Sequence, residues 1–204
     1  MLSIIIPSYY DPFLKKTVDS LLKSARGDIE IIAVQDGPLD KSPDKPDKRV
    51  KLIVHQQNMG MRASINAGLA QARGKFIMKC DAHCLFAAGF DKILSENCDV
   101  NQLMIPRRYS LDHLKWCRSL HRPFRDYHYL TYPGLTPQDW LQGGKDDPKY
   151  DIDDTMTFQG SCWVANRKYF EKRVGYLDDR PEAYGRFGGE QVEIGLKYWL
   201  CGGQ

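Results

Sequence analysis

The sequence contains no long hydrophobic run, and this absence argues against a membrane-spanning helix. No apolar stretch approaches the roughly 20 residues that a helix needs to cross a bilayer. The apolar segment from Leu2 to Ile6 is too short for the core of a signal peptide, and it has no basic flank. We therefore predict a protein with no transmembrane segment, and we expect it in the cytoplasm.

Cysteine pairs with the spacing of metal or redox motifs are also missing. The six cysteines include no C-x-x-C pair, so they predict reduced thiols of an intracellular protein. Cys80, His83 and Cys84 resemble part of a zinc knuckle, but the second cysteine pair with knuckle spacing is absent. Structural zinc is therefore the less favoured interpretation of this cluster.

Basic residues are neither concentrated nor in large excess. The net charge is +3, from 29 Lys and Arg against 26 Asp and Glu, and no dense basic stripe indicates binding to nucleic acid. Hydrophobic residues make up 42% of the chain and charged residues 27%, which is typical of a globular protein. The 204 residues are enough for one α/β domain with a substantial core.

Short apolar runs alternate with helical patterns through the first 80 residues. The runs predict buried strands at 2–6, 29–34, 50–54 and 75–80. Helical spacing of apolar residues predicts helices at 12–24 and from the turn at 58–60 to residue 72. A Pro-, Asp- and Lys-rich segment at 40–48 predicts an exposed loop between them. This order of elements is typical of an α/β fold with a parallel, doubly wound sheet.

The second half of the chain has a different character. Residues 107–150 hold two arginine runs and many aromatic residues among Pro and Gly, and we expect an irregular, partly mobile excursion there. Beyond it, the pattern predicts a strand at 158–164, a short helix at 167–173 and a final helix at 190–199.

Polar residues directly follow three of the predicted strands. They are Pro7-Ser8-Tyr9, Asp36 and the triplet Asp81-Ala82-His83. Ligands of parallel sheets bind beyond the carboxyl ends of the strands. We therefore expect these residues to meet at one rim and to form a binding site.

The D-x-H triplet predicts a metal site. It places a carboxylate and an imidazole on the same side of a tight turn, and two such ligands leave several coordination positions open. Oxygen-rich ligation suits Mg²⁺ or Mn²⁺, and one imidazole shifts the preference toward Mn²⁺. We predict that Asp81 and His83 bind Mn²⁺ (or Mg²⁺), because such an ion can neutralise the leaving phosphate of a nucleotide diphosphate.

The same residues also have purely structural interpretations. Asp36 and Asp81 are good turn or cap residues, and His83 could be a hydrogen-bonded structural histidine. Arg62 could be a solvated residue on a helix surface. Glu190-Gln191 could simply begin a helix, since carboxylates favour that end. The convergence of several strand ends on one rim favours the functional interpretation.

Motifs along nearly the whole chain resemble family 2 glycosyltransferases with the GT-A fold. The general ones are Ser3-Ile4-Ile5-Ile6-Pro7-Ser8-Tyr9, Val34-Gln35-Asp36-Gly37, Asn58-Met59-Gly60 and Asn66-Ala67-Gly68-Leu69. Asp81-Ala82-His83-Cys84 more specifically resembles the D-x-H-C motif of polypeptide N-acetylgalactosaminyltransferases. Phe187-Gly188-Gly189-Glu190-Gln191 and Tyr198-Trp199-Leu200-Cys201-Gly202-Gly203 resemble that family's W-G-G-E-N block and its W-x-C-G-G segment.

This resemblance implies a single catalytic domain over residues 1–204, with a Rossmann-like, mostly parallel sheet flanked by helices. Residues 1–105 would form the nucleotide-binding half and residues 106–204 the half that binds the sugar and acceptor. The implied reaction is metal-dependent transfer of a hexose or N-acetylhexosamine from a UDP-sugar to a saccharide or protein acceptor.

The resemblance also implies roles for individual residues. Pro7, Ser8 and Tyr9 would line the pocket for the base and ribose, and Asp36 would accept a hydrogen bond from uracil. Arg62 would approach the diphosphate, where a guanidinium can bind two phosphate oxygens. Asp81 would contact the nucleotide through the metal that it holds with His83. Glu190 would face the sugar or the acceptor, so Glu190 and Gln191 are the predicted catalytic pair.

Departures from the family pattern bear on the mechanism. Inverting family 2 enzymes carry a general-base Asp where this chain has Gln191, and an amide cannot take a proton from a hydroxyl. The polypeptide transferases have Asn there and retain the anomeric configuration, so Gln191 favours retention. Their third metal ligand, a His beyond the C-G-G segment, has no counterpart before Gln204. The chain is therefore either a fragment, truncated at its C-terminus, or relies on substrate and water to complete the ion's shell.

Three alternatives remain open. An inverting enzyme would use Glu190 or an Asp of the 146–154 cluster as its base. A non-catalytic module would bind nucleotide sugars without turning them over. A sugar-nucleotide-forming nucleotidyltransferase is the least favoured, because the segment after the first strand is not a Gly-rich basic loop.

Overall fold

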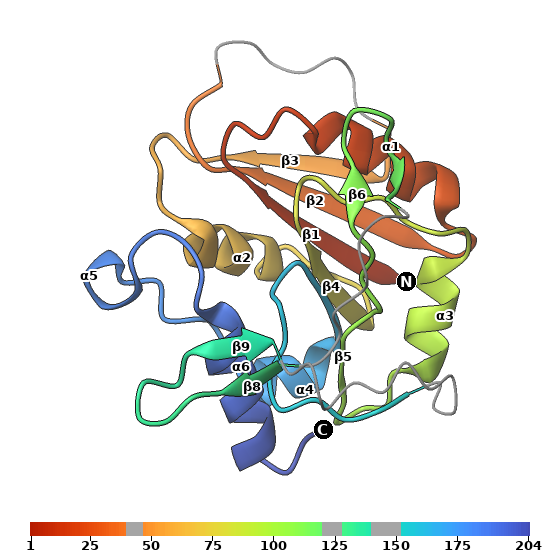
Figure 1. Ribbon diagram of the computed structural model, residues 1–204. Helices are drawn as coiled ribbons and strands as arrows, with labels where there is room; N and C mark the ends of the chain where they lie inside the picture. Colours follow the sequence, from red (N-terminus) through yellow and green to blue (C-terminus); the bar gives the residue numbers. More distant parts are fainter. Residues whose placement is uncertain (40–46, 120–127, 140–151) are drawn as a thin grey trace.

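A computed structural model describes residues 1–39, 47–119, 128–139 and 152–204 (Figure 1). The strands are β1 (Leu2–Ser8), β2 (Ile29–Gln35), β3 (Val50–Val54), β4 (Phe76–Cys80), β5 (Leu103–Met104), β6 (Leu111–Asp112), β7 (Cys117–Arg118), β8 (His128–Leu130), β9 (Pro137–Asp139) and β10 (Cys162–Asn166). The helices are α1 (Leu14–Ser24), α2 (Met61–Leu69), α3 (Phe90–Asn97), α4 (Arg167–Arg173), α5 (Pro181–Tyr184) and α6 (Glu190–Leu200).

One mixed sheet organises the molecule, with strand order β3-β2-β1-β4-β10-β5. The strands β3, β2, β1 and β4 are parallel, with Leu2 opposite both Ile29 and Phe76. β10 runs antiparallel to β4 and to β5, so it is the one strand of this sheet with the opposite direction. The predicted α/β architecture with a mostly parallel sheet is confirmed.

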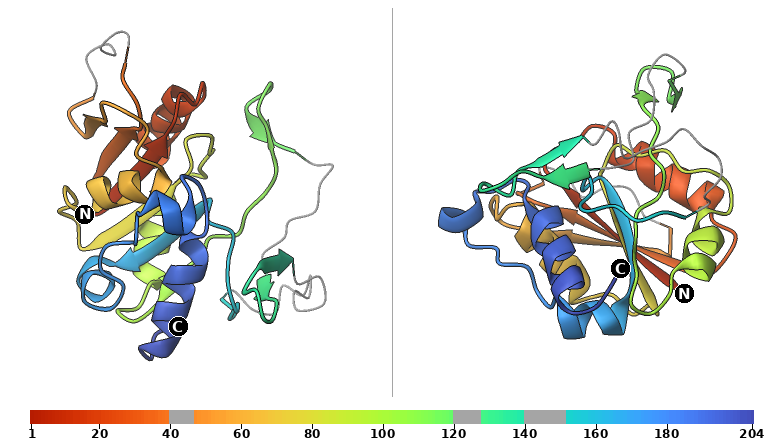
Figure 2. Two further views of the ribbon diagram at one scale, coloured as in Figure 1. Left: turned by 90° about the vertical axis from the view of Figure 1, so that its left-hand side faces the viewer. Right: turned by 60° about the horizontal axis from the view of Figure 1, so that its bottom comes forward.

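Helices cover both faces of the sheet, which is why its central strands are buried (Figure 2, right). On one face, Ile4 and Met78 pack in a cluster with Leu21 of α1 and Phe90 of α3. The residues that alternate with them point to the other face and join side chains from α2, α4 and α6. That second cluster includes Ile5, Ile32, Ile77, Ile65, Phe170 and Ile194. The continuous apolar runs of the sequence thus fill two cores at once.

Several elements differ from the sequence-based expectation. The strand predicted at 158–164 is Cys162–Asn166, because pairing with β4 begins opposite Cys80. The short helix α3 and the edge strand β5 lack a strong sequence pattern and were not predicted. The predicted loop at 40–48 lies largely outside the described residues.

The segment expected to be irregular contains two small hairpins. β6 pairs with β7, and β8 pairs with β9. In Figure 2 (left) both stand away from the main sheet. Their strands have two or three residues each, too few for a periodic sequence signal. Residues 120–127 and 140–150 of this segment lie outside the described residues.

Four cysteines, Cys80, Cys84, Cys98 and Cys162, pack as small apolar groups in one core cluster, whereas Cys117 and Cys201 are exposed. All six are free thiols, and Cys80 and Cys162 lie opposite each other on β4 and β10. Burial raises the pKa of both thiols well above its ordinary value, so they stay protonated and are poor metal ligands. Within the described ranges, no helix is both long and apolar enough to span a bilayer.

Candidate active site

The predicted rim exists at the carboxyl edge of the sheet. β1, β2 and β4 are adjacent and parallel, so Ser8, Asp36 and Asp81 emerge at the same edge. Two backbone hydrogen bonds extend the strands into the rim. The N–H of Asp36 donates to the carbonyl of Ser8 at 2.7 Å, and that of Asp81 donates to the carbonyl of Ser161 at 2.9 Å. The first bond joins the ends of β1 and β2, and the second joins the end of β4 to the segment before β10.

Asp81 and His83 face each other across the turn after β4. Asp81 Oδ2 lies 3.8 Å from His83 Nε2. The other carboxylate oxygen, Oδ1, accepts a hydrogen bond from Lys79 Nζ at 2.6 Å. The other ring nitrogen, Nδ1, lies 2.8 Å from Asp11 Oδ2. The side chains of Asp81 and His83 are 23% and 56% exposed, so a ligand can reach them from solvent.

This pair fits a divalent ion as two of its ligands. Two bonds of about 2.1 Å can span the 3.8 Å between Asp81 Oδ2 and His83 Nε2. One carboxylate oxygen and one imidazole nitrogen are donors that Mn²⁺ accepts. In the part of the chain that the structure describes, no cluster of three or more His, Cys, Asp or Glu could hold a metal. An ion here would keep several positions for water and substrate.

Lys79 is a buried cation beneath the rim. Its side chain is 1% exposed, and its Nζ donates to Asp81 Oδ1 and to the carbonyl of Gly160, each at 2.6 Å. Glu190 Oε1 is 3.9 Å from the same nitrogen. Burial alone would lower the pKa of Lys79, but the charges of Asp81 and Glu190 outweigh it and raise that pKa. The ammonium therefore stays charged and links two carboxylates of the site.

Glu190 is the first residue of α6, and a sharp turn brings it inside the protein. Gly188 and Gly189, immediately before it, adopt positive φ angles of 83° and 76°. Residues with a side chain rarely adopt such angles, so glycine is needed for this turn. The Glu190 side chain is 2% exposed, and its Oε2 has no hydrogen-bond partner among the described residues. Burial raises the pKa of this carboxyl despite the nearby charge of Lys79. Gln191 follows it at the half-buried start of the helix.

Asp36 holds the loop that leads into α2. Its carboxylate accepts hydrogen bonds from the N–H groups of Met59 at 2.7 Å and Gly60 at 2.8 Å. Its Oδ1 also lies 2.9 Å from His55 Nδ1. A carboxylate offers about four acceptor positions, so about one remains for a ligand. Asp36 thus has a structural role beside its predicted contact with uracil.

The end of β1 and the residue that follows it present a polar atom and an aromatic surface. Ser8 is buried, and its Oγ lacks a hydrogen-bond partner within the described ranges. Tyr9 is 59% exposed and its ring packs edge-on against Tyr10, with centroids 4.9 Å apart. Pro7 lies at the half-buried end of the strand. A ribose can supply the hydrogen-bond partner that the Ser8 hydroxyl lacks, and a base can pack against the exposed rings.

Arg62 is deeply engaged with the C-terminal part of the chain. Its guanidinium forms an ion pair with Glu193 and donates to the carbonyls of Asp178 at 3.1 Å and Gly188 at 3.3 Å. The Tyr184 ring centroid lies 3.9 Å from Arg62 Cζ. Its Nη2 is buried without a hydrogen-bond partner among the residues described. Arg62 therefore anchors the loop before Glu190, and only Nη2 remains for the predicted diphosphate contact.

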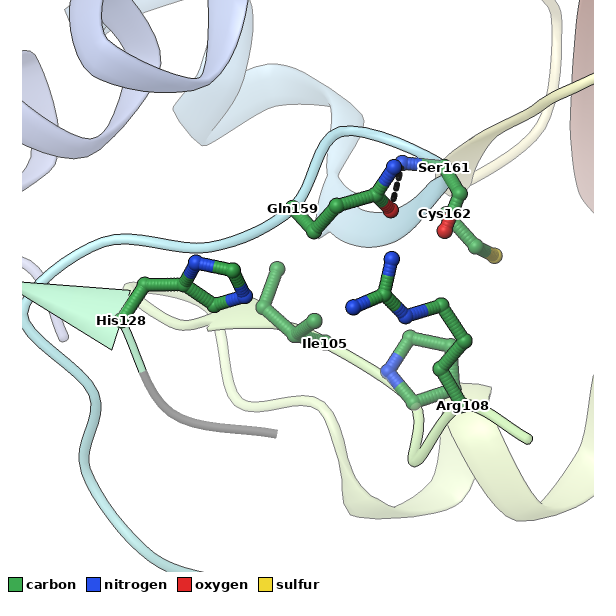
Figure 3. Close-up of a pocket in the computed structure, with 7 residues that line it drawn as sticks. Ile105, Arg108, His128, Gln159, Ser161 and Cys162 are labelled. Carbon is green, nitrogen blue, oxygen red and sulfur yellow. Dashed lines mark hydrogen bonds between the residues drawn. The ribbon is translucent and has the colours of Figure 1, made fainter. Parts of the chain in front are cut away.

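A small cavity lies beside the segment from Gln159 to Cys162 (Figure 3). It has a volume of about 30 Å³ and is lined by Ile105, Pro106, Arg108, His128, Gln159, Ser161 and Cys162. Gln159 Oε1 accepts a hydrogen bond from the Ser161 N–H at 2.8 Å, which closes one wall. A space of this size holds one or two water molecules rather than a sugar ring.

Sequence reasoning missed two residues of the site. Lys79 interrupts the apolar run of β4, and a charged residue inside a buried strand was the available signal. Asp11 follows β1 by three residues and meets His83 only because the chain folds back beside α1. No spacing rule links residues 11 and 83, so this contact needed the structure.

The Rossmann-like sheet, with a D-x-H turn at the end of β4 and a buried Glu at the start of α6, is the arrangement expected of a glycosyltransferase domain of the GT-A class. The chain belongs to glycosyl transferase family 2, whose sequence model matches residues 3–174. This assignment confirms the resemblance seen in the motifs.

The similar proteins are longer than this chain. EpsJ, an uncharacterized glycosyltransferase of Bacillus subtilis (strain 168), is 37% identical over 112 residues, which are 52% of this chain and 32% of EpsJ. Polypeptide N-acetylgalactosaminyltransferase 18 of Homo sapiens is 25% identical over 99% of this chain and 34% of its own length. The chain therefore spans about a third of these curated relatives.

A solved structure has the same fold. The crystal structure of GalNAc-T7 with UDP, GalNAc and Mn²⁺ matches 100% of this chain and 40% of its own, with a TM-score of 0.69. The sequence identity is 17%, so this likeness concerns the fold alone.

Proposed function

We propose that this domain is a metal-dependent glycosyltransferase that moves a hexose or N-acetylhexosamine from a UDP-sugar to a saccharide or protein acceptor. The observation that carries the proposal is the pair Asp81 Oδ2 and His83 Nε2, 3.8 Å apart at the solvent-accessible end of β4. The relatives support it, since GalNAc-T7 was crystallised with UDP, GalNAc and Mn²⁺.

In this proposal the rim holds the nucleotide. Asp36 accepts the uracil N–H at its remaining acceptor position, while Pro7, Ser8 and Tyr9 enclose the base and ribose. Ser8 Oγ gains the hydrogen-bond partner that it lacks among the described residues. Arg62 Nη2 offers a donor toward the diphosphate. A divalent ion bound by Asp81 and His83 would neutralise charge that develops on the leaving diphosphate.

The chain's own residues favour retention of configuration. Gln191 has no basic atom, so it cannot deprotonate the acceptor hydroxyl. Proton removal then falls to the departing diphosphate, on the face from which the acceptor arrives. Glu190, held near Lys79, orients the sugar or stabilises charge beside it rather than acting as a nucleophile.

The burial of Glu190 favours the inverting enzyme as a second candidate function. Burial raises the pKa of Glu190, and a general base works best with a pKa near the operating pH. Glu190 would then take the acceptor proton directly. The anomeric configuration of the product, assigned by NMR from an α-linked UDP-sugar, separates the two. An α-linked product supports retention, and a β-linked product means inversion, with Glu190 the first candidate for the base.

The proposed function is tested with Mn²⁺ and UDP on this chain. The midpoint of thermal unfolding should rise when both are present, because they bind the folded state. Asp81→Asn should abolish this Mn²⁺-dependent shift, measured against that variant's own metal-free midpoint, because the loss of the partner of the buried Lys79 lowers the midpoint by itself. Turnover of a UDP-sugar with Mn²⁺ separates an enzyme from a non-catalytic binding module. An unchanged Mn²⁺–UDP affinity in Asp81→Asn would place the metal elsewhere.

A further inference from the structure

Asp11 makes a contact with His83 that none of the recognised motifs includes. Asp11 Oδ2 lies 2.8 Å from His83 Nδ1, although 72 residues separate them in the chain. His83 Nε2 points the other way and lies 3.8 Å from Asp81 Oδ2. The two ring nitrogens thus face two different carboxylates. This arrangement decides which nitrogen carries the proton.

A neutral imidazole holds one proton, on either Nδ1 or Nε2. A carboxylate 2.8 Å from Nδ1 accepts a hydrogen bond and so favours the form with the proton on that nitrogen. The lone pair then lies on Nε2, which faces Asp81. A histidine that binds a metal commonly donates its second N–H to a carboxylate in this way.

We infer that Asp11 is a positioning residue of the metal site: it fixes the His83 ring with the Nε2 lone pair turned toward Asp81. This inference rests on the proposed function, because it assumes an ion shared by Asp81 and His83. Lys79 completes the arrangement from the other side, since it binds Asp81 Oδ1 and leaves Oδ2 facing His83.

Asp11 also has a local structural role, and each of its two carboxylate oxygens makes a different contact. Oδ1 accepts a hydrogen bond from the Phe13 N–H at 2.8 Å, which shapes the turn before α1. Oδ2 is the atom that meets His83. Asparagine keeps an oxygen for the turn but replaces the second oxygen with an N–H donor. Asp11→Asn therefore separates the turn from the effect on the imidazole.

The experiment compares Asp11→Asn with a matched control, Asp19→Asn. Asp19 lies on α1, is 58% exposed and pairs with Lys15, so its substitution removes one negative charge without removing a contact to His83. Two quantities are measured. The first is the tautomer of His83, measured by ¹⁵N NMR of the metal-free protein. The pH is about 8, where an imidazole is ordinarily neutral. The His83 signal is assigned by its absence from the spectrum of His83→Gln. The second is Mn²⁺ affinity in the presence of UDP, by electron paramagnetic resonance of the free ion.

The wild type and Asp19→Asn should show the proton on Nδ1 and equal Mn²⁺ affinities. Asp11→Asn should move the proton to Nε2 and weaken Mn²⁺ binding 10- to 100-fold, the range typical of lost outer ligand contacts, with an unchanged unfolding midpoint. An Nδ1 proton retained in Asp11→Asn, or unchanged Mn²⁺ affinity, would overturn the inference. A wild type that binds no Mn²⁺ with UDP would count against the proposed function, and the metal-free tautomer would still decide whether Asp11 sets the ring.

Discussion

Gly160 and Glu190 touch at the centre of the site, and the contact leaves no room for a side chain on the glycine. A Cβ atom added to Gly160 would overlap Glu190 Oε1. Gly160 lies two residues before β10, and its carbonyl accepts a hydrogen bond from Lys79 Nζ at 2.6 Å. The absence of a side chain is what lets this backbone approach both the buried carboxylate and its cation.

Gly160→Ala should therefore displace Glu190 and lower turnover. Oε1 is the far end of a side chain, so the overlap is relieved by moving Glu190 while the fold survives. Misplacing a group at the reacting centre by about 1 Å can cost roughly 100-fold in rate. We expect kcat to fall at least about tenfold and UDP affinity to change much less, as measured by steady-state kinetics and calorimetry.

The matched control for this variant is Gly195→Ala on α6. A Cβ there would meet only Phe158 Cε1, at an ordinary 3.9 Å. Its turnover should match that of the wild type. If Gly160→Ala kept the wild-type kcat, the position of Glu190 would not limit the reaction.

Lys79→Met should destabilise the metal-free protein strongly. The substitution removes the cation that lies 2.6 Å from Asp81 and 3.9 Å from Glu190, and it leaves two carboxylates without their shared partner. Breaking a buried ion pair by removing one member costs about 3–5 kcal/mol. Because Asp81 is 23% exposed, we expect the lower end, about 3 kcal/mol, in the free energy of unfolding from urea titration.

Two further variants test this explanation. Adding Glu190→Gln to Lys79→Met should restore part of the loss, since one unpaired charge disappears. Lys15→Met, which breaks the exposed pair with Asp19, should change stability by less than about 1 kcal/mol. A Lys79→Met protein as stable as the Lys15→Met control would show that the buried ammonium contributes nothing to the fold.

The fold was predictable because its signals are local. The continuous apolar runs of β1, β2 and β4 identify strands buried on both faces, and the alternation with helices fixes a parallel sheet. Asp36 and Asp81 could be assigned to one edge because parallel neighbours end together. The boundaries of β10 were less predictable, since they depend on which residues pair with β4.

The supporting contacts of the site were not predictable, for a physical reason. Arg62 looks like a surface helix residue in the sequence, yet it is buried against Glu193, 131 positions later. The contact between Asp11 and His83 likewise depends on how two loops meet. Such contacts arise from tertiary packing, which periodicity and spacing do not encode.

The stability of the fold should also depend on pH through Glu30. This carboxylate accepts hydrogen bonds from Ser3 Oγ at 2.6 Å and from the Arg73 backbone N–H at 2.7 Å. Burial alone would raise its pKa, but the hydrogen bonds and the charge of Arg73 outweigh it and hold the pKa below 4.5. A folded-state pKa below the unfolded value stabilises the protein above the unfolded pKa. That contribution is lost as the pH falls from about 4.5 through the folded-state pKa.

Glu30→Gln should therefore cost about 1.5–3 kcal/mol of unfolding free energy at pH 7, the range for hydrogen bonds to a charged group. The difference from the wild type should shrink as the pH falls from about 4.5 through the lowered folded-state pKa, because the native carboxylate takes up a proton over that range. Urea titrations at pH 7, 5 and 3.5 measure this. Glu171→Gln, which removes an exposed pair with Arg167, should show little dependence on pH. A constant deficit of Glu30→Gln at all three values would mean that its charge is irrelevant.

Asp36 should select uracil, and the wild-type protein can test this without any substitution. Uracil presents an N–H where cytosine presents a lone pair, so a carboxylate acceptor binds the first and repels the second. Two backbone N–H groups and His55 already occupy most of the Asp36 carboxylate, which fixes the direction of the remaining acceptor position. A charged hydrogen bond of about 1.5–3 kcal/mol corresponds to roughly 10- to 150-fold tighter binding of UDP than of CDP.

Asp36→Ala should abolish this preference as well as weaken UDP binding. It also releases the N–H groups of Met59 and Gly60, so a loss of UDP affinity alone would not distinguish base recognition from a disturbed loop. The ratio of UDP to CDP affinity distinguishes the two explanations. A disturbed loop weakens the binding of both nucleotides, whereas a lost base contact removes the preference for UDP. Calorimetry with Mn²⁺ present gives both affinities for both proteins. Equal binding of UDP and CDP by the wild type would mean that the site does not select uracil, and an unchanged ratio in Asp36→Ala would assign the selection to another residue of the rim; either result would leave Asp36 with its structural role alone.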